Sequence, residues 1–164
     1  LSELPGTRVY CTITTLDDDL WKIAEPGTPS PATRLETLRM LSSAGVRTGV
    51  LMAPLLPGIS DSKDAILQVA EAVADAGAET FATSPLRLDP GVKEHYFNWV
   101  ALHFPDLMRR YEVSFGSRHL SQDYHLRISA ITDVARERFG LGERGFRGAR
   151  QSMATQPVIQ LALV

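Results

Sequence analysis

The absence of several residue patterns restricts what this 164-residue sequence can encode. Cys11 is the single cysteine, so neither a disulfide framework nor a multi-cysteine metal site can form within the chain. No apolar run approaches the ~20 residues that a membrane-spanning helix needs. The first residues lack the charged and apolar regions of a secretory signal, and we therefore expect a cytoplasmic protein with no membrane partner.

Other missing patterns exclude classes of function. A formal net charge of −2 excludes a strongly basic nucleic-acid-binding protein, although local basic patches remain compatible with it. The phosphate-binding patterns GxGxxG and GxxxxGK[ST] do not occur. The histidines have no metal-ligand spacing such as HxxxH. The remaining composition, 44% hydrophobic and 22% charged, is that of an ordinary globular domain or of part of one.

The order of the segments predicts an α/β fold. Short runs of apolar and β-branched residues alternate with helical patterns, which is typical of parallel strands joined by helical crossovers. We expect the strands at Arg8–Leu16, Val46–Ala53 and Glu79–Leu88. The first crossover helix begins at Ser30-Pro31, and Ser60 or Asp61 caps the second. Three strands make a small sheet, which suggests that half of a barrel is missing.

Further helices follow the third strand. Asp89-Pro90 predicts a helix start, Tyr111–Leu120 is expected to be connecting structure, and Ser121 is expected to cap a last helix that Gly140 ends. We divide the chain into residues 1–141, a barrel half with trailing helices, and residues 142–164, a flexible Arg/Gly-rich tail that ends in an apolar segment.

Two polar features stand near the expected carboxyl end of the first strand. Thr12 and Thr14 alternate with apolar residues and so face the same side, where their hydroxyl groups could hold a ribose or an amino acid head group. Their alternative role is ordinary strand formation. Arg34 lies on a first helical turn and could hold a ligand carboxylate as a bidentate pair. It could equally pair with Glu25 or with the acidic run Asp17–Asp19.

The stretch Gly49–Asp61 reads as a buried strand followed by a Pro/Gly-rich turn. In barrels of alternating strands and helices, the loops that leave the carboxyl ends of the strands carry the chemistry. We therefore expect this turn to border any site that the protein has. An unrelated α/β enzyme that uses strand-end carboxylates, for example Asp17 and Asp89, is an alternative interpretation.

Several blocks of the sequence resemble one family. The runs TITTLD (12–17), EPGTPSPATRLETL (25–38) and AGVRTGVLMAPLLPGISD (44–61) are similar, in sequence and spacing, to radical S-adenosylmethionine proteins of the spore photoproduct lyase-like, "DNA repair photolyase" group. The run LRLDPGVKEHYFNWVALHFPDLMRRY (86–111) and the terminal QLALV extend the resemblance. It covers nearly the whole chain, but only the second half of the family's domain.

The resemblance implies a partial (β/α)6 barrel that holds S-adenosylmethionine and a [4Fe-4S] cluster. Reductive cleavage of S-adenosylmethionine then gives a 5′-deoxyadenosyl radical, which abstracts a hydrogen atom from a substrate. The resemblance assigns the contact with S-adenosylmethionine to Thr12 and Thr14 and its carboxylate to Arg34. The wall against the adenine would be formed by Ala53, Pro54, Leu56 and Gly58.

The chain departs from the family pattern in one respect. The CxxxCxxC cluster motif and the Gly-Gly-Glu stretch lie upstream in the family, and neither is present here. We therefore expect the C-terminal half of a radical S-adenosylmethionine enzyme, inactive alone, with no catalytic or metal-ligating residue of its own. Its expected partner is the missing N-terminal half, and a nucleic acid is one candidate substrate. The alternative is a non-catalytic α/β module that binds a partner or a nucleotide.

Overall fold

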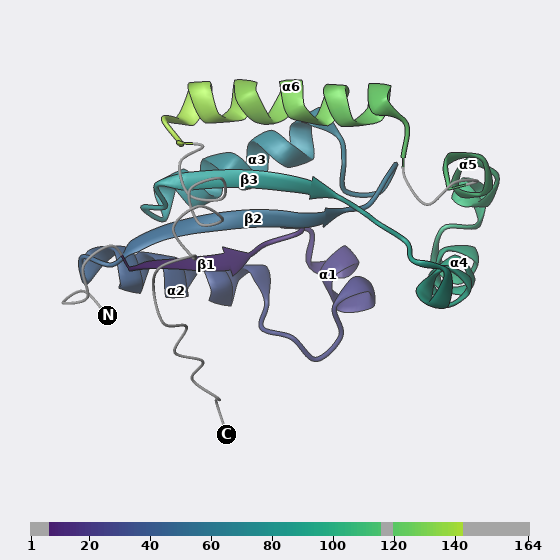
Figure 1. Ribbon diagram of the computed structural model, residues 1–164. Helices are drawn as coiled ribbons and strands as arrows, with labels where there is room; N and C mark the ends of the chain where they lie inside the picture. The colour runs from purple at the N-terminus through teal and green to yellow at the C-terminus, as the bar shows by residue number, and fades with distance from the viewer. Residues whose placement is uncertain (1–6, 116–119, 143–164) are drawn as a thin grey trace, which may run out of the picture.

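The computed structural model describes residues 7–115 and 120–142. A parallel sheet lies at the centre, with strand order β1-β2-β3 and strands β1 (Arg8–Thr12), β2 (Arg47–Leu55) and β3 (Thr80–Pro85). Figure 1 shows the three arrowheads pointing the same way. The predicted α/β class and the three parallel strands are therefore confirmed.

Helices and one 3₁₀ turn connect and follow the strands. In chain order these elements are α1 (Asp18–Ala24), α2 (Pro31–Ser43), α3 (Lys63–Asp75), α4 (Pro90–His103), η1 (Pro105–Leu107), α5 (Met108–Ser114) and α6 (Gln122–Phe139). No helix in the described part of the chain has the length and apolar character needed to cross a membrane.

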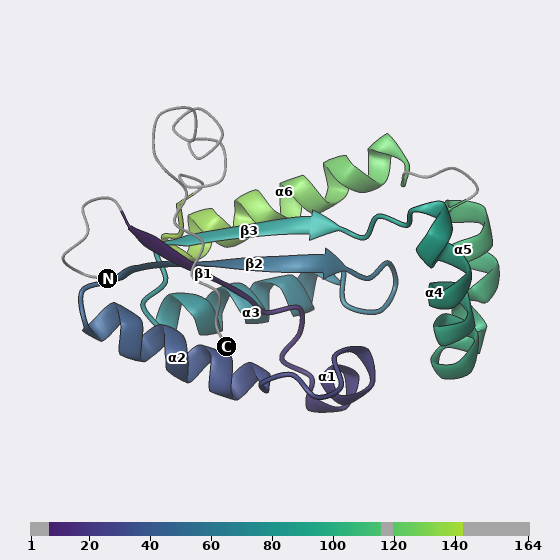
Figure 2. The same ribbon diagram turned by 60° about the horizontal axis from the view of Figure 1, so that its bottom comes forward.

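One face of the sheet carries the first hydrophobic core. Val50 and Met52 of β2 and Phe81 of β3 are almost fully buried there against α2, α3 and α6. Helix α3 contributes the buried stripe Ile66, Val69, Ala70 and Val73. These three helices cover this face of the sheet in Figure 2. Removal of this apolar surface from water is the main force that stabilises the sheet.

The opposite face of the sheet lacks the continuous aliphatic packing of the first, and its centre is a glycine. The register pairs Tyr10 with Gly49 and Gly49 with Thr80 across the three strands. A Cβ atom on Gly49 would lie 2.2 Å from the Thr80 hydroxyl and 2.7 Å from the Tyr10 ring, so only glycine fits at this position. On the same face, Leu51 and Ala82 are only half-buried and belong to neither hydrophobic core of the described residues.

The two edges of the sheet differ. At β3, Gly142 forms a parallel bridge to Thr80, and Arg136 of α6 donates a 2.7 Å hydrogen bond to the Phe81 carbonyl group. Within the described residues, β1 pairs with β2 alone. An edge strand is a template for further strand pairing.

A second, aromatic core lies beyond the carboxyl ends of the strands. Helix α4, η1 and α5 enclose Val100, Tyr111 and Phe115, all with 0% exposure. The Tyr111 and Phe115 rings stack at 5.5 Å. Both ribbon views place α4 and α5 past the arrowheads of the strands (Figures 1 and 2). The residues of α4, η1 and α5 are called the aromatic cap below.

Several predicted boundaries were wrong in detail. The expected cap of the second crossover helix was Ser60 or Asp61, but the Ser62 hydroxyl accepts the Ala65 N–H at 3.1 Å instead. Part of the expected connection at Tyr111–Leu120 is helical, since α5 runs to Ser114. The cap at Ser121 and the stop at Gly140 (φ +67°) are confirmed. The expected tail falls outside the described residues, apart from residue 142.

Candidate functional site

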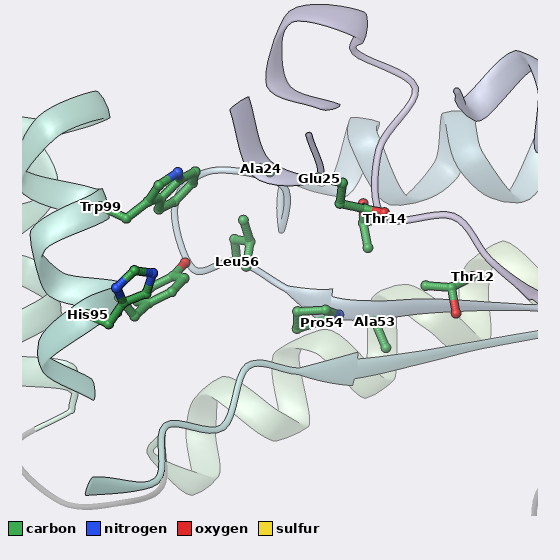
Figure 3. A pocket seen from close by; sticks show the side chains of 10 residues that line it. Thr12, Thr14, Ala24, Glu25, Ala53, Pro54, Leu56, His95 and Trp99 are labelled. Carbon is green, nitrogen blue, oxygen red and sulfur yellow. The ribbon is translucent and has the colours of Figure 1, made fainter. Parts of the chain in front are cut away.

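A cavity of about 350 Å³ lies between the strand ends and the aromatic cap. Figure 3 shows its labelled side chains converging from β1, from β2 and the turn after it, from the end of α1 and from α4. Of the seven residues expected to contact S-adenosylmethionine, five line this cavity: Thr12, Thr14, Ala53, Pro54 and Leu56. Carboxyl ends of parallel strands are a common location for ligand sites in α/β proteins.

The end of β1 supplies the hydroxyl groups of the cavity. Thr12 ends the strand, and the backbone continues in register for one more residue because the Ile13 N–H bonds to the Leu51 carbonyl group at 3.2 Å. Ile13 is therefore buried, and Thr12 and Thr14 on either side both face the cavity. The predicted common orientation of Thr12 and Thr14 is confirmed, and it follows from the two-residue periodicity of a strand.

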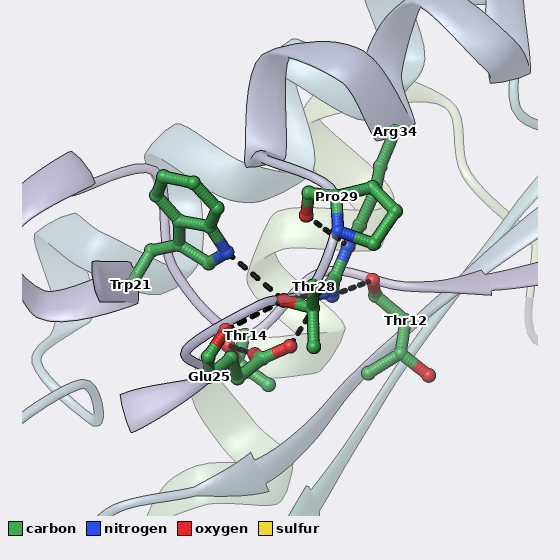
Figure 4. Close-up of polar contacts among 7 residues, drawn as sticks. All are labelled: Thr12, Thr14, Trp21, Glu25, Thr28, Pro29 and Arg34. Carbon is green, nitrogen blue, oxygen red and sulfur yellow. Dashed lines mark hydrogen bonds and ion pairs between the residues drawn. The ribbon is translucent and has the colours of Figure 1, made fainter. Parts of the chain in front are cut away.

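Arg34 belongs to a network behind the cavity wall and does not line the cavity. Its guanidinium group forms an ion pair with Glu25 at 2.6 Å and donates to the Thr12 carbonyl group at 2.8 Å. It also donates to the Pro29 carbonyl group at 2.9 Å and to the Thr28 hydroxyl at 2.8 Å. Figure 4 shows these contacts. Arg34 was expected to bind either a ligand carboxylate or a nearby acidic residue, and in the structure it pairs with Glu25.

Thr28 holds the proline-containing loop between α1 and α2 in one shape. Its hydroxyl donates to the Glu25 carbonyl group at 2.8 Å and accepts the Trp21 indole N–H at 3.0 Å. With the bond from Arg34, three elements meet at one side chain (Figure 4). The loop is therefore fixed by side-chain hydrogen bonds and can position Glu25 at the rim of the cavity.

The end of β2 forms the apolar wall. Ala53 and Pro54, joined by a cis peptide bond, lie where the β2–β3 register shifts between Met52 and Leu55. The Leu56 N–H donates to the buried Ser60 hydroxyl at 3.0 Å, which fixes the first turn of the loop. This wall presents a methyl group, a proline ring and a leucine side chain, which suit a flat apolar ligand surface.

Gly58 and Asp61 stabilise the same loop from outside the cavity. Gly58 has a φ of +78°, and its N–H donates to Asp61 at 2.7 Å. Asp61 is 4% exposed, and its second carboxylate oxygen pairs with Arg127 of α6 at 2.7 Å. Because Asp61 is not the cap of α3, its role is to fasten the β2–α3 loop to α6. Neither Gly58 nor Asp61 lines the cavity.

Helix α4 supplies an aromatic wall that sequence reasoning missed. His95, Tyr96 and Trp99 line the cavity opposite the strand ends. The Trp99 indole donates to the Ile23 carbonyl group at 3.1 Å, which ties α4 to α1. Burial raises the pKa of Tyr96 to about 12. The spacing of His95 and Trp99, four residues apart, places both on one helix face and is the signal that could have identified them.

Metal binding has little support in the described part of the chain, where no three His, Cys, Asp or Glu side chains converge to hold an ion. Cys11 is half-buried against the first core, on the opposite face of β1 from Thr12. Burial raises the pKa of its thiol, which disfavours the thiolate form that binds metals. An iron–sulfur cluster therefore does not fit on the residues described.

Asp17 and Asp89, the carboxylates considered for a different α/β enzyme, both stand at the start of a helix. Asp17 caps α1 by accepting the N–H groups of Asp19 and Leu20 at 2.9 and 3.0 Å. Asp89 occupies the N-cap position of α4 without a side-chain capping bond. Among the described residues that line the cavity, Glu25 is the single carboxylate, and it is already paired with Arg34. Its lining suits binding of a polar, partly flat ligand better than acid–base chemistry by two carboxylates.

Comparison with known proteins finds relatives that are longer than this chain. The chain is 33% identical over 149 residues to the uncharacterized proteins Rv2578c of Mycobacterium tuberculosis and Mb2609c of Mycobacterium bovis, covering 90% of this chain and 42% of each relative. It is 27% identical over 121 residues to the uncharacterized protein ORF301 of Acidianus two-tailed virus, covering 71% of this chain and 40% of that protein.

No family model and no solved structure matches the chain. The chain spans about two fifths of the length of these curated relatives. The similarity is thus limited to one segment of each longer relative. The alignment with the mycobacterial proteins covers 90% of this chain and so includes most of the residues described above.

Proposed function

We propose that this chain is the C-terminal half of a radical S-adenosylmethionine barrel and forms one wall of the S-adenosylmethionine site. The observation that carries the proposal is the cavity of about 350 Å³ at the ends of β1 and β2. Five residues that the family resemblance assigns to S-adenosylmethionine contacts line it. Its hydroxyl groups suit a ribose, and Ala53, Pro54 and Leu56 suit an adenine ring.

Two features of the fold support the incomplete barrel. In the described part of the chain, helices cover one face of the sheet, whereas parallel sheets normally have both faces covered. Residues of the other face, such as Leu51 and Ala82, are half-buried in the described structure, and β1 lies at the edge of the sheet. A further set of strands beside β1 would bury this face and close the barrel. The partial coverage of the relatives is consistent with that arrangement.

The cofactors would be divided between the two halves. The residues of this chain fit one side of S-adenosylmethionine, but they supply no set of ligands for a [4Fe-4S] cluster. When bound, the cluster and S-adenosylmethionine would supply a 5′-deoxyadenosyl radical for hydrogen abstraction. The residues of this chain would bind and orient the nucleoside part and exclude water from it. A nucleic acid is a candidate substrate.

The direct test begins with the coding sequence upstream of Leu1. We expect an in-frame CxxxCxxC motif, and a start codon at Leu1 without such a motif would contradict the proposal. The complete protein, reconstituted anaerobically with iron and sulfide, should then release 5′-deoxyadenosine from S-adenosylmethionine when it is reduced.

A pair of variants connects that activity to this chain. Ala53→Trp would fill the cavity, so we expect loss of at least tenfold in S-adenosylmethionine affinity. Ala130→Trp on the exposed side of α6 is the matched control, since it adds the same volume outside the cavity. Equal affinities of the two variants would show that the cavity is not the binding site.

A further inference from the structure

Glu25 lies at the polar end of the cavity. Its hydrogen bonds determine whether the groups at that end can donate to a ligand or only accept from it. One carboxylate oxygen accepts the Thr14 hydroxyl, and the other forms the ion pair with Arg34 at 2.6 Å. An ionised carboxylate can only accept hydrogen bonds. The single O–H of Thr14 is therefore committed to Glu25, and the Thr14 oxygen can offer a ligand only its acceptor lone pairs.

Arg34 has almost no donor capacity left for a ligand. A guanidinium group has five N–H donors, and four of them are used, on Pro29, Thr12, Glu25 and Thr28. Bidentate recognition of a carboxylate needs two parallel N–H groups. One remaining N–H cannot provide that, so a ligand carboxylate would have to break the ion pair with Glu25.

The rest of the cavity adds a requirement for shape. Opposite Thr14 stand His95 and Trp99 of α4, and the wall between is apolar at Pro54 and Leu56 (Figure 3). Such a lining accepts a flat ring by stacking and apolar contact. A ligand that satisfies both ends carries hydroxyl or amine donors at one end and a flat ring at the other.

We propose that Glu25 is a specificity-determining residue that makes this cavity select the ribose hydroxyls of a nucleoside and reject a carboxylate at the Thr14 end. This rests on the proposed function in taking the ligand to be a nucleoside. Glu25 acts by positioning: it orients the Thr14 hydroxyl and keeps the Arg34 guanidinium occupied. Arg34 then organises the loop behind the wall, and the carboxylate of S-adenosylmethionine is held elsewhere.

The test uses calorimetric titration of the complete protein with adenosine and with 2′,3′-dideoxyadenosine, which lacks both ribose hydroxyls. We expect adenosine to bind about tenfold more tightly, the value of one hydrogen bond of roughly 1.5 kcal/mol. Thr14→Val should reduce the ratio of the two affinities to near one, and Thr14→Ser should retain it. Glu25→Gln should lower the ratio several-fold, because an amide can donate to Thr14 as well as accept.

Glu36→Gln is the matched control, since Glu36 pairs with Arg39 on the exposed side of α2. Its affinity ratio should equal that of the unmodified protein. Circular dichroism checks folding, and Thr14→Val, which preserves the side-chain shape, tests the inference if Glu25→Gln does not fold.

The inference is overturned if adenosine does not bind, if dideoxyadenosine binds as tightly as adenosine, or if Glu25→Gln keeps the full ratio. These outcomes are separate from the proposed function, which fails when no cluster forms and no 5′-deoxyadenosine is released. A protein that discriminates the ribose hydroxyls without forming a cluster would retain the role of Glu25 and lose the radical chemistry.

Discussion

The two hydrophobic cores of this chain differ in composition and in origin. The first is mainly aliphatic, with Phe81 as its fully buried aromatic residue, and lies between the sheet and α2, α3 and α6. The second, inside the aromatic cap, is built around Tyr111 and Phe115 and involves no strand. The candidate cavity lies between the two, with strand ends on one side and α4 on the other.

This difference leads us to expect one rigid wall and one more mobile wall of the cavity. The first core sets the strand ends through backbone pairing, which leaves Thr12 and Ala53 little freedom. The aromatic cap is joined to the rest by the leucines in its core, among them Leu56 and Leu86, and by the hydrogen bond from Trp99 to Ile23, but it pairs with no strand in the described residues. Regions with fewer links to the main core open at lower free energy. We expect the aromatic wall of the cavity to be the more mobile one.

The largest expected effect comes from removing one aromatic ring of the cap. Phe115→Ala creates a cavity in a fully buried position and should cost about 3–5 kcal/mol of local stability. In a Trp21→Phe background, Trp99 is the sole tryptophan, and its fluorescence should report loss of the cap at low urea while far-ultraviolet circular dichroism of the sheet persists.

Phe81→Ala in the first core is the matched control, because Phe81 is also a buried phenylalanine. It should lower both signals together. Coincident transitions in Phe115→Ala would mean instead that the two cores form one cooperative unit.

The second largest effect is expected at alkaline pH, which should lower the stability of the aromatic cap. Burial raises the pKa of Tyr96 from 10.0 to about 12, so the folded state keeps the phenol neutral where the unfolded state ionises. The stability from this group is complete below pH 10 and is lost as the pH rises to about 12, on the order of 2–3 kcal/mol.

Urea unfolding followed at Trp99 between pH 8 and pH 12 measures this loss. Tyr96→Phe should show a smaller decrease, with a remainder from Tyr111, whose pKa burial also raises. An identical pH profile in Tyr96→Phe would contradict the assignment to Tyr96.

Removing the ion pair between the β2–α3 loop and α6 should have an intermediate effect on stability. Asp61→Asn keeps an acceptor for the Gly58 N–H but removes the charge that pairs with Arg127. A bond to a charged group at a buried site is worth about 2 kcal/mol, and thermal unfolding should show that loss. Asp64→Asn, an exposed neighbour in the first turn of α3, is the control; equal losses would exclude the proposed link.

The smallest effect concerns the cap of α3. Ser62→Ala removes the bond to the Ala65 N–H and should cost about 1 kcal/mol in chemical denaturation. Ser62→Asp should restore most of the stability because aspartate caps equally well. Ser43→Ala, on the exposed last turn of α2, should be near neutral. A loss for Ser43→Ala as large as for Ser62→Ala would show that capping is not the cause.

The sequence was sufficient where local signals agree with the tertiary structure. Thr12 and Thr14 were placed on one face by the strand period, and both reach the cavity. Ser121 and Gly140 were correctly predicted as the ends of α6. The Ser60 and Asp61 prediction was wrong because both residues are good capping types, and their hydrogen bonds to Leu56 and Gly58 come from the shape of the loop.

The amino-acid sequence by itself determined the α/β alternation and the parallel strands, because these follow from the order and the periodicity of single elements. Only the tertiary structure decided that Arg34 is held by Glu25 and that α4 faces the strand ends with His95 and Trp99. Contacts of this kind join residues 9 to 76 positions apart. Their partners are chosen by the packing of whole elements, which no local pattern of residues encodes.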